Sequence, residues 1–199
     1  MMKKNSIQAL CVSAILLAMS IGLSFVKIWT LPLGGSVTLL SMLPLCFVSI
    51  KYGLGWGLGA AFCYSWFQIL QDPPFGWGLS IGMLLASLAL DYIVAFTAIG
   101  LAGSFRRHGT VGMMLGVVMA LVLRFLSHFL SGVLLWANFK QFEFFGHSFE
   151  GRPVLYSLVY NGSYMLPELV MTVIGAALLL CIPQIRKLVD PAPKAEKQA

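Results

Sequence analysis

The sequence predicts an all-α membrane protein, folded as one domain of six transmembrane helices. Of its 199 residues, 59% are hydrophobic and only 10% are charged, whereas soluble domains contain about 45–50% apolar and about 25% charged residues. A water-soluble domain of this size could not cover so much apolar surface, and a disordered chain would not contain it. No polar stretch is long enough to form a catalytic domain outside the membrane.

Apolar runs separated by breaks rich in Gly, Pro or charge support this prediction. A helix needs about 20 apolar residues to cross a bilayer core. The six runs cover residues 7–26, 37–50, 54–70, 79–105, 111–136 and 157–182. We therefore expect residues 1–189 to form a single six-helix transmembrane domain. Residues 190–199, which contain mainly Pro, Ala, Lys and Glu, are expected to form a disordered cytoplasmic tail.

The first three runs differ in how they begin. The first follows Lys3 and Lys4; it is about twice as long as the apolar region of a signal peptide and five more runs follow, so we expect an uncleaved helix. The second is short and follows a Pro-Gly break. The third contains glycines at alternate positions from 53 to 59. These glycines lack the order of a phosphate-binding loop and follow no strand, so we expect them to start and pack a helix.

The last three runs are longer and follow clearer breaks. The fourth follows Asp72-Pro73-Pro74, and the fifth follows Arg106-Arg107-His108-Gly109. The sixth follows a long aromatic loop, 138–153, which acts as a lid or lies on the membrane surface. The four cysteines lie in apolar runs without C-x-x-C spacing, so we expect small buried side chains and no metal site.

The basic residues predict which side of the membrane each loop occupies. With six helices, the two termini and the second and fourth connections share one side, and most Lys and Arg residues fall there. The net charge of +6 then reflects topology and headgroup contact, not nucleic-acid binding, and both termini are expected to be cytoplasmic. The cytoplasmic set is Lys3, Lys4, Lys51, Arg106, Arg107, Arg186, Lys187, Lys194 and Lys197, and the outer set is Lys27, Lys140 and Arg152.

Three ionisable residues, Asp91, Arg124 and Glu168, fall near the middle of predicted helices. A charge at that depth costs about 2.5–3.5 kcal/mol, so each of them needs a partner or a use. One carboxylate can pair with Arg124, and the other is left over, either protonated or holding a cation. The alternative is a purely structural salt bridge beside a neutral acid, and these residues alone leave both interpretations open.

Aromatic and amide side chains collect in the outer half, above this charged layer. Arg124, His128 and Trp136 recur after four and eight residues, which places them on one helix face. Trp and Tyr often form a belt at the membrane interface, but His and Asn are not usual belt residues. We therefore expect an outward-facing pocket suited to a small, flat, cationic heterocycle. Further members of this set are Trp29, Tyr92, Tyr156, Tyr160, Asn161 and Tyr164.

The first predicted helix carries a stripe of small residues, Ala14, Ala18 and Gly22, at four-residue spacing. Small residues at this spacing let another helix approach closely. That helix belongs either to this chain or to a partner protein, and the spacing does not decide between the two.

Four segments, taken in order, give the sequence a family resemblance. They are LPLGGS at 31–36, DYIVAF at 91–96, HFLSG at 128–132 with Trp136 beyond it, and YSLVYNGSYMLPE at 156–168. The first is expected to open the second helix and the last to open the sixth. Over roughly residues 9–182 the chain resembles the ThiT (YuaJ) family, the thiamine-binding S components of energy-coupling factor (ECF) transporters.

The resemblance implies a multi-pass subunit of the bacterial cell membrane that binds thiamine with high affinity near its outer face. Such a subunit has six helices, uses no cofactor and is not an enzyme. It docks on a transmembrane coupling protein that carries two ATPase subunits, and Ala14 and Ala18 match the family's docking motif. The thiamine-binding residues that the resemblance implies are Trp29, Asp91, Tyr92, His128, Trp136, Tyr156 and Asn161.

Other functions stay open beside thiamine binding. The pocket could serve another vitamin or a thiamine precursor. An intramembrane enzyme would use Glu168 or Asp91 with His128, although the chain has no H-E-x-x-H motif. A channel is disfavoured, because no helix carries repeated polar residues. The family has Glu where this chain has Asp91, which is one methylene shorter, so Glu168 could share the acidic role.

Overall fold

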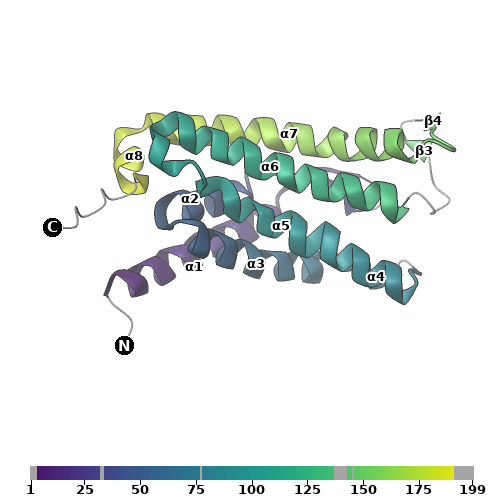
Figure 1. Ribbon diagram of the computed structural model, residues 1–199, viewed down its shortest axis with the longest axis horizontal. Coiled ribbons are helices and arrows are strands. Elements are labelled where there is room, and N and C mark those ends of the chain that lie inside the picture. The colour runs from purple at the N-terminus through teal and green to yellow at the C-terminus, as the bar shows by residue number, and fades with distance from the viewer. Residues whose placement is uncertain (1–3, 32–33, 77, 137–142, 145, 191–199) are drawn as a thin grey trace, which may run out of the picture.

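The computed structural model describes residues 4–31, 34–76, 78–136, 143–144 and 146–190. Its long helices lie side by side along one axis, and the first described helix begins at the end of the bundle where the last one finishes (Figure 1). The α-helices are α1 (Lys4–Ser24), α2 (Leu43–Tyr52), α3 (Leu54–Gln71), α4 (Ile81–Ser87), α5 (Ala95–Thr97), α6 (Gly109–Leu134), α7 (Pro153–Cys181) and α8 (Pro183–Val189).

The helix that begins with α4 changes its hydrogen-bonding pattern along its length. A π-helical segment, η3 (Leu88–Val94), follows α4, and a 3₁₀ segment, η4 (Ala98–Gly103), follows α5. Shorter 3₁₀ turns, η2 (Pro74–Gly76) and η5 (Arg106–His108), flank this helix.

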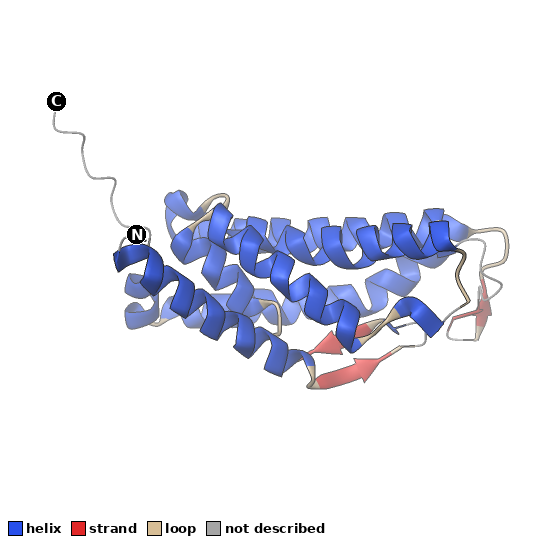
Figure 2. Cartoon of the chain, turned by 90° about the horizontal axis from the view of Figure 1, so that it is seen from below, coloured by secondary structure: helices blue, strands red, loops and turns tan. Residues whose placement is uncertain are grey.

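Two small antiparallel hairpins complete the described fold. One pairs β1 (Lys27–Thr30) with β2 (Ser36–Thr38), and the other pairs β3 (Glu143–Phe144) with β4 (His147–Ser148). Figure 2 shows them as the strands at the ends of the helices. The fold is therefore mostly helical, in agreement with the predicted class, and the two short hairpins are an addition that the sequence did not predict.

Three helical stretches of the described chain are long and apolar enough to cross a membrane, Ser6–Ser24, Ile81–Leu134 and Pro153–Cys181. The middle one has 54 residues, and as one straight helix it would reach about 80 Å. The chain instead reverses at 104–109, where Gly109 has a φ of 67°, and α6 runs back beside α4 and α5 (Figure 1). This stretch is thus two antiparallel legs.

Helix α2 forms the centre of the core. Every residue from Leu43 to Ile50 is buried, because α1, α3, η4 and α8 pack around it. A helix that is apolar on all sides is expected in such a position. Beside it, α3 and η4 cross in backbone contact, since a Cβ on Gly100 would lie 2.5 Å from the backbone nitrogen of Leu58.

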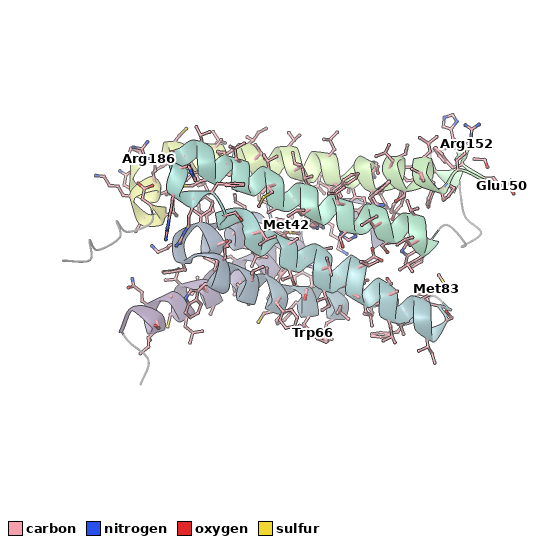
Figure 3. The ribbon with its side chains drawn as sticks, in the orientation of Figure 1. Met42, Trp66, Met83, Glu150, Arg152 and Arg186 are labelled. Carbon is pink, nitrogen blue, oxygen red and sulfur yellow. The ribbon has the colours of Figure 1, made fainter. Side chains whose placement is uncertain are left out.

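The outside of the helices is strongly apolar. Leu70, Ile81 and Val111 are more than two-thirds exposed, and Trp66 points away from the bundle (Figure 3). Apolar surface of this extent would be unfavourable in water and favourable against lipid tails. Together with the apolar helices, it identifies a membrane protein.

Several expectations from the sequence are corrected here. The second apolar run is not helical at its start: residues 36–38 form β2, and α2 begins only at Leu43, after Leu40 with a φ of 56°. Of the LPLGGS segment, Pro32 and Leu33 lie outside the described residues and Ser36 begins β2, so the segment does not open a helix. Of the cysteines only Cys46 is buried, and the other three are exposed on the outer surface. The glycines before and within α3 do act as expected at Gly53, its N-cap, and at Gly57.

Candidate functional site

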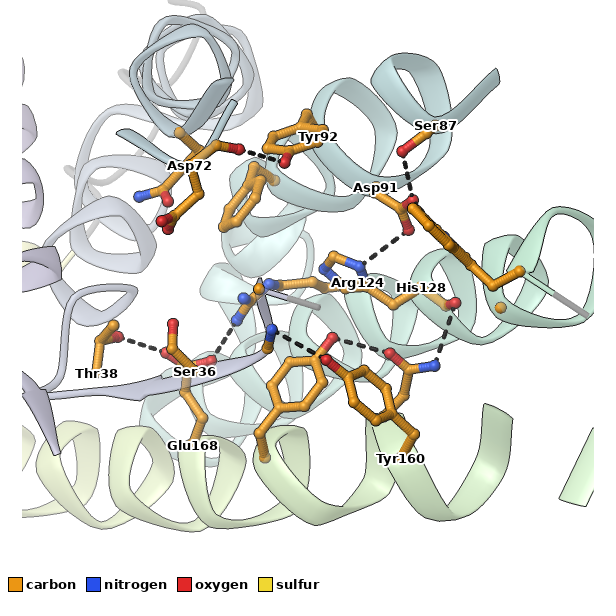
Figure 4. Close-up of a pocket in the computed structure, with 18 of the residues that line it drawn as sticks. Ser36, Thr38, Asp72, Ser87, Asp91, Tyr92, Arg124, His128, Tyr160 and Glu168 are labelled. Carbon is orange, nitrogen blue, oxygen red and sulfur yellow. Dashed lines mark hydrogen bonds and ion pairs between the residues drawn. The ribbon is translucent and has the colours of Figure 1, made fainter. Parts of the chain in front are cut away.

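A pocket lies between α3, η3, α6, α7 and the segment 34–38. A concave site lined by apolar and a few polar side chains is the usual form of a small-molecule site. Figure 4 shows polar side chains from these elements converging on it. The lining residues are Gly34, Gly35, Ser36, Thr38, Met42, Tyr64, Gln68, Asp72, Ser87, Asp91, Tyr92, Phe96, Arg124, His128, Gly132, Trp136, Tyr156, Ser157, Tyr160, Asn161, Tyr164 and Glu168.

Asp91 accepts several hydrogen bonds on one side of this pocket. Its Oδ2 accepts from Ser87 Oγ at 2.9 Å, from Ser131 Oγ at 2.6 Å and from Trp136 Nε1 at 3.2 Å. Its Oδ1 lies 3.3 Å from His128 Nδ1. Apart from the imidazole, whose charge depends on protonation, these partners are neutral, so they stabilise a carboxylate without cancelling its charge.

The local backbone explains this convergence. Asp91 and Tyr92 lie in the π-helical segment η3, and such segments are rare and often occur at functional sites. On α6, His128 and Ser131 are three residues apart and therefore share a face. Ser127 on the same helix donates to the backbone oxygen of Leu90 at 2.6 Å and holds α6 against η3.

A second acid lies deeper, and it is fully paired. Glu168 Oε2 accepts from Arg124 Nη1 at 2.6 Å, and Oε1 accepts from Thr38 Oγ1 at 2.6 Å. The two charged side chains are only 5% and 1% exposed. The Arg124 guanidinium also lies over the Phe96 ring, 4.7 Å from its centroid. This ion pair is neutral as a unit and joins α6, α7 and β2.

The third acid of the pocket, Asp72, is also neutralised. Lys27 Nζ on β1 lies 2.8 Å from Asp72 Oδ2, and Tyr92 Oη donates to the backbone oxygen of Asp72. Among the pocket residues that the structure describes, Asp91 is therefore the carboxylate without a Lys or Arg partner. With a neutral His128 imidazole, the pocket carries one negative charge in excess.

Tyrosines and an amide on α7 form the opposite wall. Tyr164 Oη donates to Asn161 Oδ1 at 2.8 Å, and Asn161 Nδ2 donates to the Ser157 backbone oxygen at 3.0 Å. Tyr160 Oη accepts from the Gly35 backbone N–H at 3.1 Å. A Cβ on Gly35 would lie 2.9 Å from that hydroxyl oxygen, so only glycine lets this segment approach the wall so closely.

Six of the seven binding residues named from the sequence line the pocket together: Asp91, Tyr92, His128, Trp136, Tyr156 and Asn161. Trp29 does not line it; this residue lies on β1 and is 39% exposed.

The sequence interpretation missed Ser87, Ser131 and three residues toward the end of α3: Tyr64, Gln68 and the C-cap residue Asp72. Helical spacing could have indicated them. Ser87 precedes Asp91 by four residues, and the three α3 residues recur every four residues on one face.

The aromatic loop and the small-residue stripe have different surroundings. Of the loop 138–153, residues 138–142 and 145 lie outside the described part. The ring centroids of Phe144 and Tyr160 are 5.3 Å apart, and those of Phe149 and Tyr156 are 6.0 Å apart. The described part of the loop therefore covers the α7 wall, as a lid would.

The small-residue stripe lies on the surface of α1, where Ala14 and Ala18 are exposed. The hypothesis that this stripe packs within the chain is therefore wrong.

Comparisons with known proteins agree with this fold. The model of a family described as thiamine transporter protein (Thia_YuaJ) matches residues 10–188. Thiamine transporter ThiT of Bacillus subtilis (strain 168) is 32% identical over 170 residues, covering 77% of this chain and 77% of that protein. The solved structure of ThiT from Listeria monocytogenes has a similar fold, with a TM-score of 0.67 at 22% identity, covering 92% of this chain and 98% of that one.

Proposed function

The chain belongs to the thiamine transporter family (Thia_YuaJ), and on that premise we propose that it is the high-affinity thiamine-binding S component of an ATP-driven ECF importer. The family and the Bacillus relative are transporters and not enzymes, so the intramembrane-enzyme hypothesis is excluded.

The observation that carries the proposal is that Asp91, unlike the other two acids of the pocket, has no Lys or Arg partner among the described residues. Thiamine has a permanent positive charge on its thiazolium ring and a flat aminopyrimidine. Arg124 neutralises Glu168 and Lys27 neutralises Asp72, which leaves Asp91 to balance the ligand. An aromatic-lined pocket with one unbalanced carboxylate suits a flat cation better than a neutral or anionic molecule.

Each binding residue has a role in this proposal. Asp91 balances the thiazolium charge or accepts from the aminopyrimidine, and Trp136 and His128 stack on a ring or bond to its edge. Asn161 and Tyr156 bond to polar edges of the ligand, and Tyr92 packs beside Asp91.

Trp29 needs a separate condition, because it does not line the pocket in this structure. It can contact thiamine only if the β1–β2 hairpin moves toward the site. We keep it in the proposed binding set on that condition.

The proposed topology has six passes: α1, α2, α3, residues 81–103, α6 and α7. Arg186 lies at the end of the bundle where α1 begins, and Arg152 lies at the opposite end (Figure 3). Lys51 donates to the backbone oxygen of Leu188 on α8, and Arg106 donates to that of Ile50 on α2. Because basic residues favour the cytoplasmic side, we place both termini in the cytoplasm and the pocket mouth outside. Residues 1–189 form the transmembrane domain in the bacterial plasma membrane, and 190–199 form a cytoplasmic tail.

The proposed partners are a transmembrane coupling protein and two ATPase subunits. Ala14 and Ala18 lie on an exposed face of α1, and a Cβ on Gly22 would meet nothing within 4 Å. Two helices in lipid gain little from apolar burial against each other, so close approach over small residues supplies the contact. This face is therefore the proposed docking surface.

Thiamine titration of the purified protein, followed by intrinsic tryptophan fluorescence, tests the proposal. Trp136 lines the pocket, so we expect saturable quenching. Competition with the pyrimidine half of thiamine separates a thiamine site from a precursor site, since a precursor site would bind that half at least as tightly. Absence of saturable binding of either compound would contradict the proposal.

Vesicle reconstitution tests the need for a coupling protein. The purified chain should bind thiamine but show no ATP-driven accumulation until the coupling and ATPase subunits are added, because the sequence contains no phosphate-binding loop. ATP-driven accumulation by the lone subunit would contradict this part of the proposal.

A further inference from the structure

Asp91 is held asymmetrically. Its Oδ2 accepts three hydrogen bonds, from Ser87, Ser131 and Trp136, whereas Oδ1 has one contact, with His128 at 3.3 Å. A carboxylate oxygen has about two lone-pair sites, so Oδ2 has no capacity left for a ligand. The oxygen available to a ligand donor or cation is Oδ1.

Ser131 makes the shortest of these contacts, and it does so from behind the site. Its Oγ is 2.6 Å from Oδ2, its side chain is fully buried, and it does not line the pocket. A ligand in the pocket meets Asp91 but not Ser131. Any effect of the Ser131 hydroxyl on binding therefore passes through the carboxylate.

We propose that Ser131 is a positioning residue for ligand binding: its hydroxyl fixes Oδ2 of Asp91 and so directs Oδ1 into the pocket. This inference rests on the proposed thiamine site and specifies how that site is organised. Asp91 has a short side chain, and the donor from α6 holds it at one rotamer across the helix interface. Ser87 supports the same oxygen from Asp91's own helix at 2.9 Å.

The chain offers a matched control. Ser127 lies four residues before Ser131 on α6, is also buried, and donates to the Leu90 backbone oxygen at 2.6 Å. It does not line the pocket either. Ser127→Ala and Ser131→Ala thus each remove one buried hydrogen bond between α6 and η3, and only Ser131→Ala removes a bond to Asp91.

Calorimetric titration with thiamine and thermal unfolding are measured for wild type, Ser127→Ala, Ser131→Ala and Ser131→Thr. Saturable binding by the wild type establishes the proposed function separately; its failure would defeat that function, whatever the serine variants do. Given wild-type binding, we expect Ser131→Ala to weaken thiamine binding roughly tenfold, the scale of one hydrogen bond to a charged group. Ser127→Ala should bind within about twofold of wild type despite a similar loss of unfolding temperature.

The variant that keeps the hydroxyl and the double variant complete the test. Ser131→Thr should recover most of the affinity. In an Asp91→Asn background, the further loss on adding Ser131→Ala should shrink below about twofold, since coupled residues are non-additive. Equal affinities of Ser131→Ala and Ser127→Ala, or an undiminished loss in the Asp91→Asn background, would overturn the inference.

Discussion

Two of the three acids that line the pocket, Glu168 and Asp91, have different surroundings. Glu168 is 1% exposed in its side chain and is neutralised by Arg124 at 2.6 Å. Asp91 is 16% exposed in its side chain and is surrounded by hydroxyls, an indole N–H and an imidazole. Glu168 is therefore held in an ion pair with Arg124, whereas Asp91 is held by hydrogen-bond donors.

The difference shows how one pocket can assign structural stability to one acid and ligand binding to the other. The Arg124–Glu168 pair, with Thr38, ties α6, α7 and β2 together and contributes no net charge. Asp91 is held in place by donors that leave its charge free for a ligand. The two acids differ in burial, but their partners decide which one can balance the charge of a ligand.

Glu168→Gln should give the largest effect, and the effect should be on stability. Removing one partner of a buried ion pair leaves the other charge uncompensated and costs about 3–5 kcal/mol. We expect a clearly lower unfolding temperature in detergent. Glu150→Gln is the control, since Glu150 is exposed.

A double variant sharpens this prediction. Replacing both Arg124 and Glu168 by Met removes the charges together and should restore much of the stability, because well-packed apolar residues can replace a buried pair. If Glu168→Gln unfolds at the wild-type temperature, the pair is not the support that its geometry indicates.

Asp91→Asn should show the opposite pattern. The substitution keeps the size of the side chain and removes the charge, so thiamine binding should weaken by about 2–5 kcal/mol, the range for truncating a buried charge partner. The unfolding temperature of the ligand-free protein should change far less than in Glu168→Gln. Unchanged thiamine affinity would contradict the role of Asp91 and make Glu168 the next acid to test.

Sequence reasoning reached most of this site because the charges were few. Asp91, Arg124 and Glu168 are conspicuous in apolar helices, and helical spacing placed His128 and Trp136 on the Arg124 face. Which acid pairs with Arg124 depends on how η3, α6 and α7 pack. Spacing within single helices does not contain that information.

The errors also have physical reasons. Residues 37–50 are mostly apolar and carry no charge, and an apolar run of that kind does not show that its first residues form a strand. The change to π-helical bonding at Leu88–Val94 has no simple sequence signal. The serines on Asp91 were overlooked because Ser is common in membrane helices, where it usually bonds to its own backbone.

Trp136→Ala tests the Asp91 side of the pocket with a smaller effect. Trp136 donates to Asp91 and lines the pocket, so its loss should weaken thiamine binding by about 1–2 kcal/mol, the scale of a desolvated cation–π contact. Trp66→Ala is the matched control, because Trp66 is 54% exposed on the outer face of α3.

The two Trp variants must differ for the pocket assignment to hold. If both bind thiamine equally well in calorimetric titrations, the α6 face does not contact the ligand. If only Trp66→Ala loses affinity, the ligand binds elsewhere on the molecule.

Ala14→Trp should leave Asp91, Glu168 and their partners undisturbed, and its effect on thiamine affinity should be the smallest of these variants. Ala14 is exposed on α1, a helix that contributes no residue to the pocket lining. A bulky indole there fills the groove that small residues keep open for a partner helix. Thiamine affinity of the purified variant should stay within about twofold of wild type, because no contact of Asp91 or Glu168 changes.

Uptake in cells that carry the full transporter should nevertheless be lost, together with co-purification of the coupling protein. Ile15→Trp, at an adjacent exposed position that is already large, is the control and should still transport. Should Ala14→Trp still co-purify and transport, the small-residue face of α1 is lipid-facing surface and the coupling protein docks elsewhere.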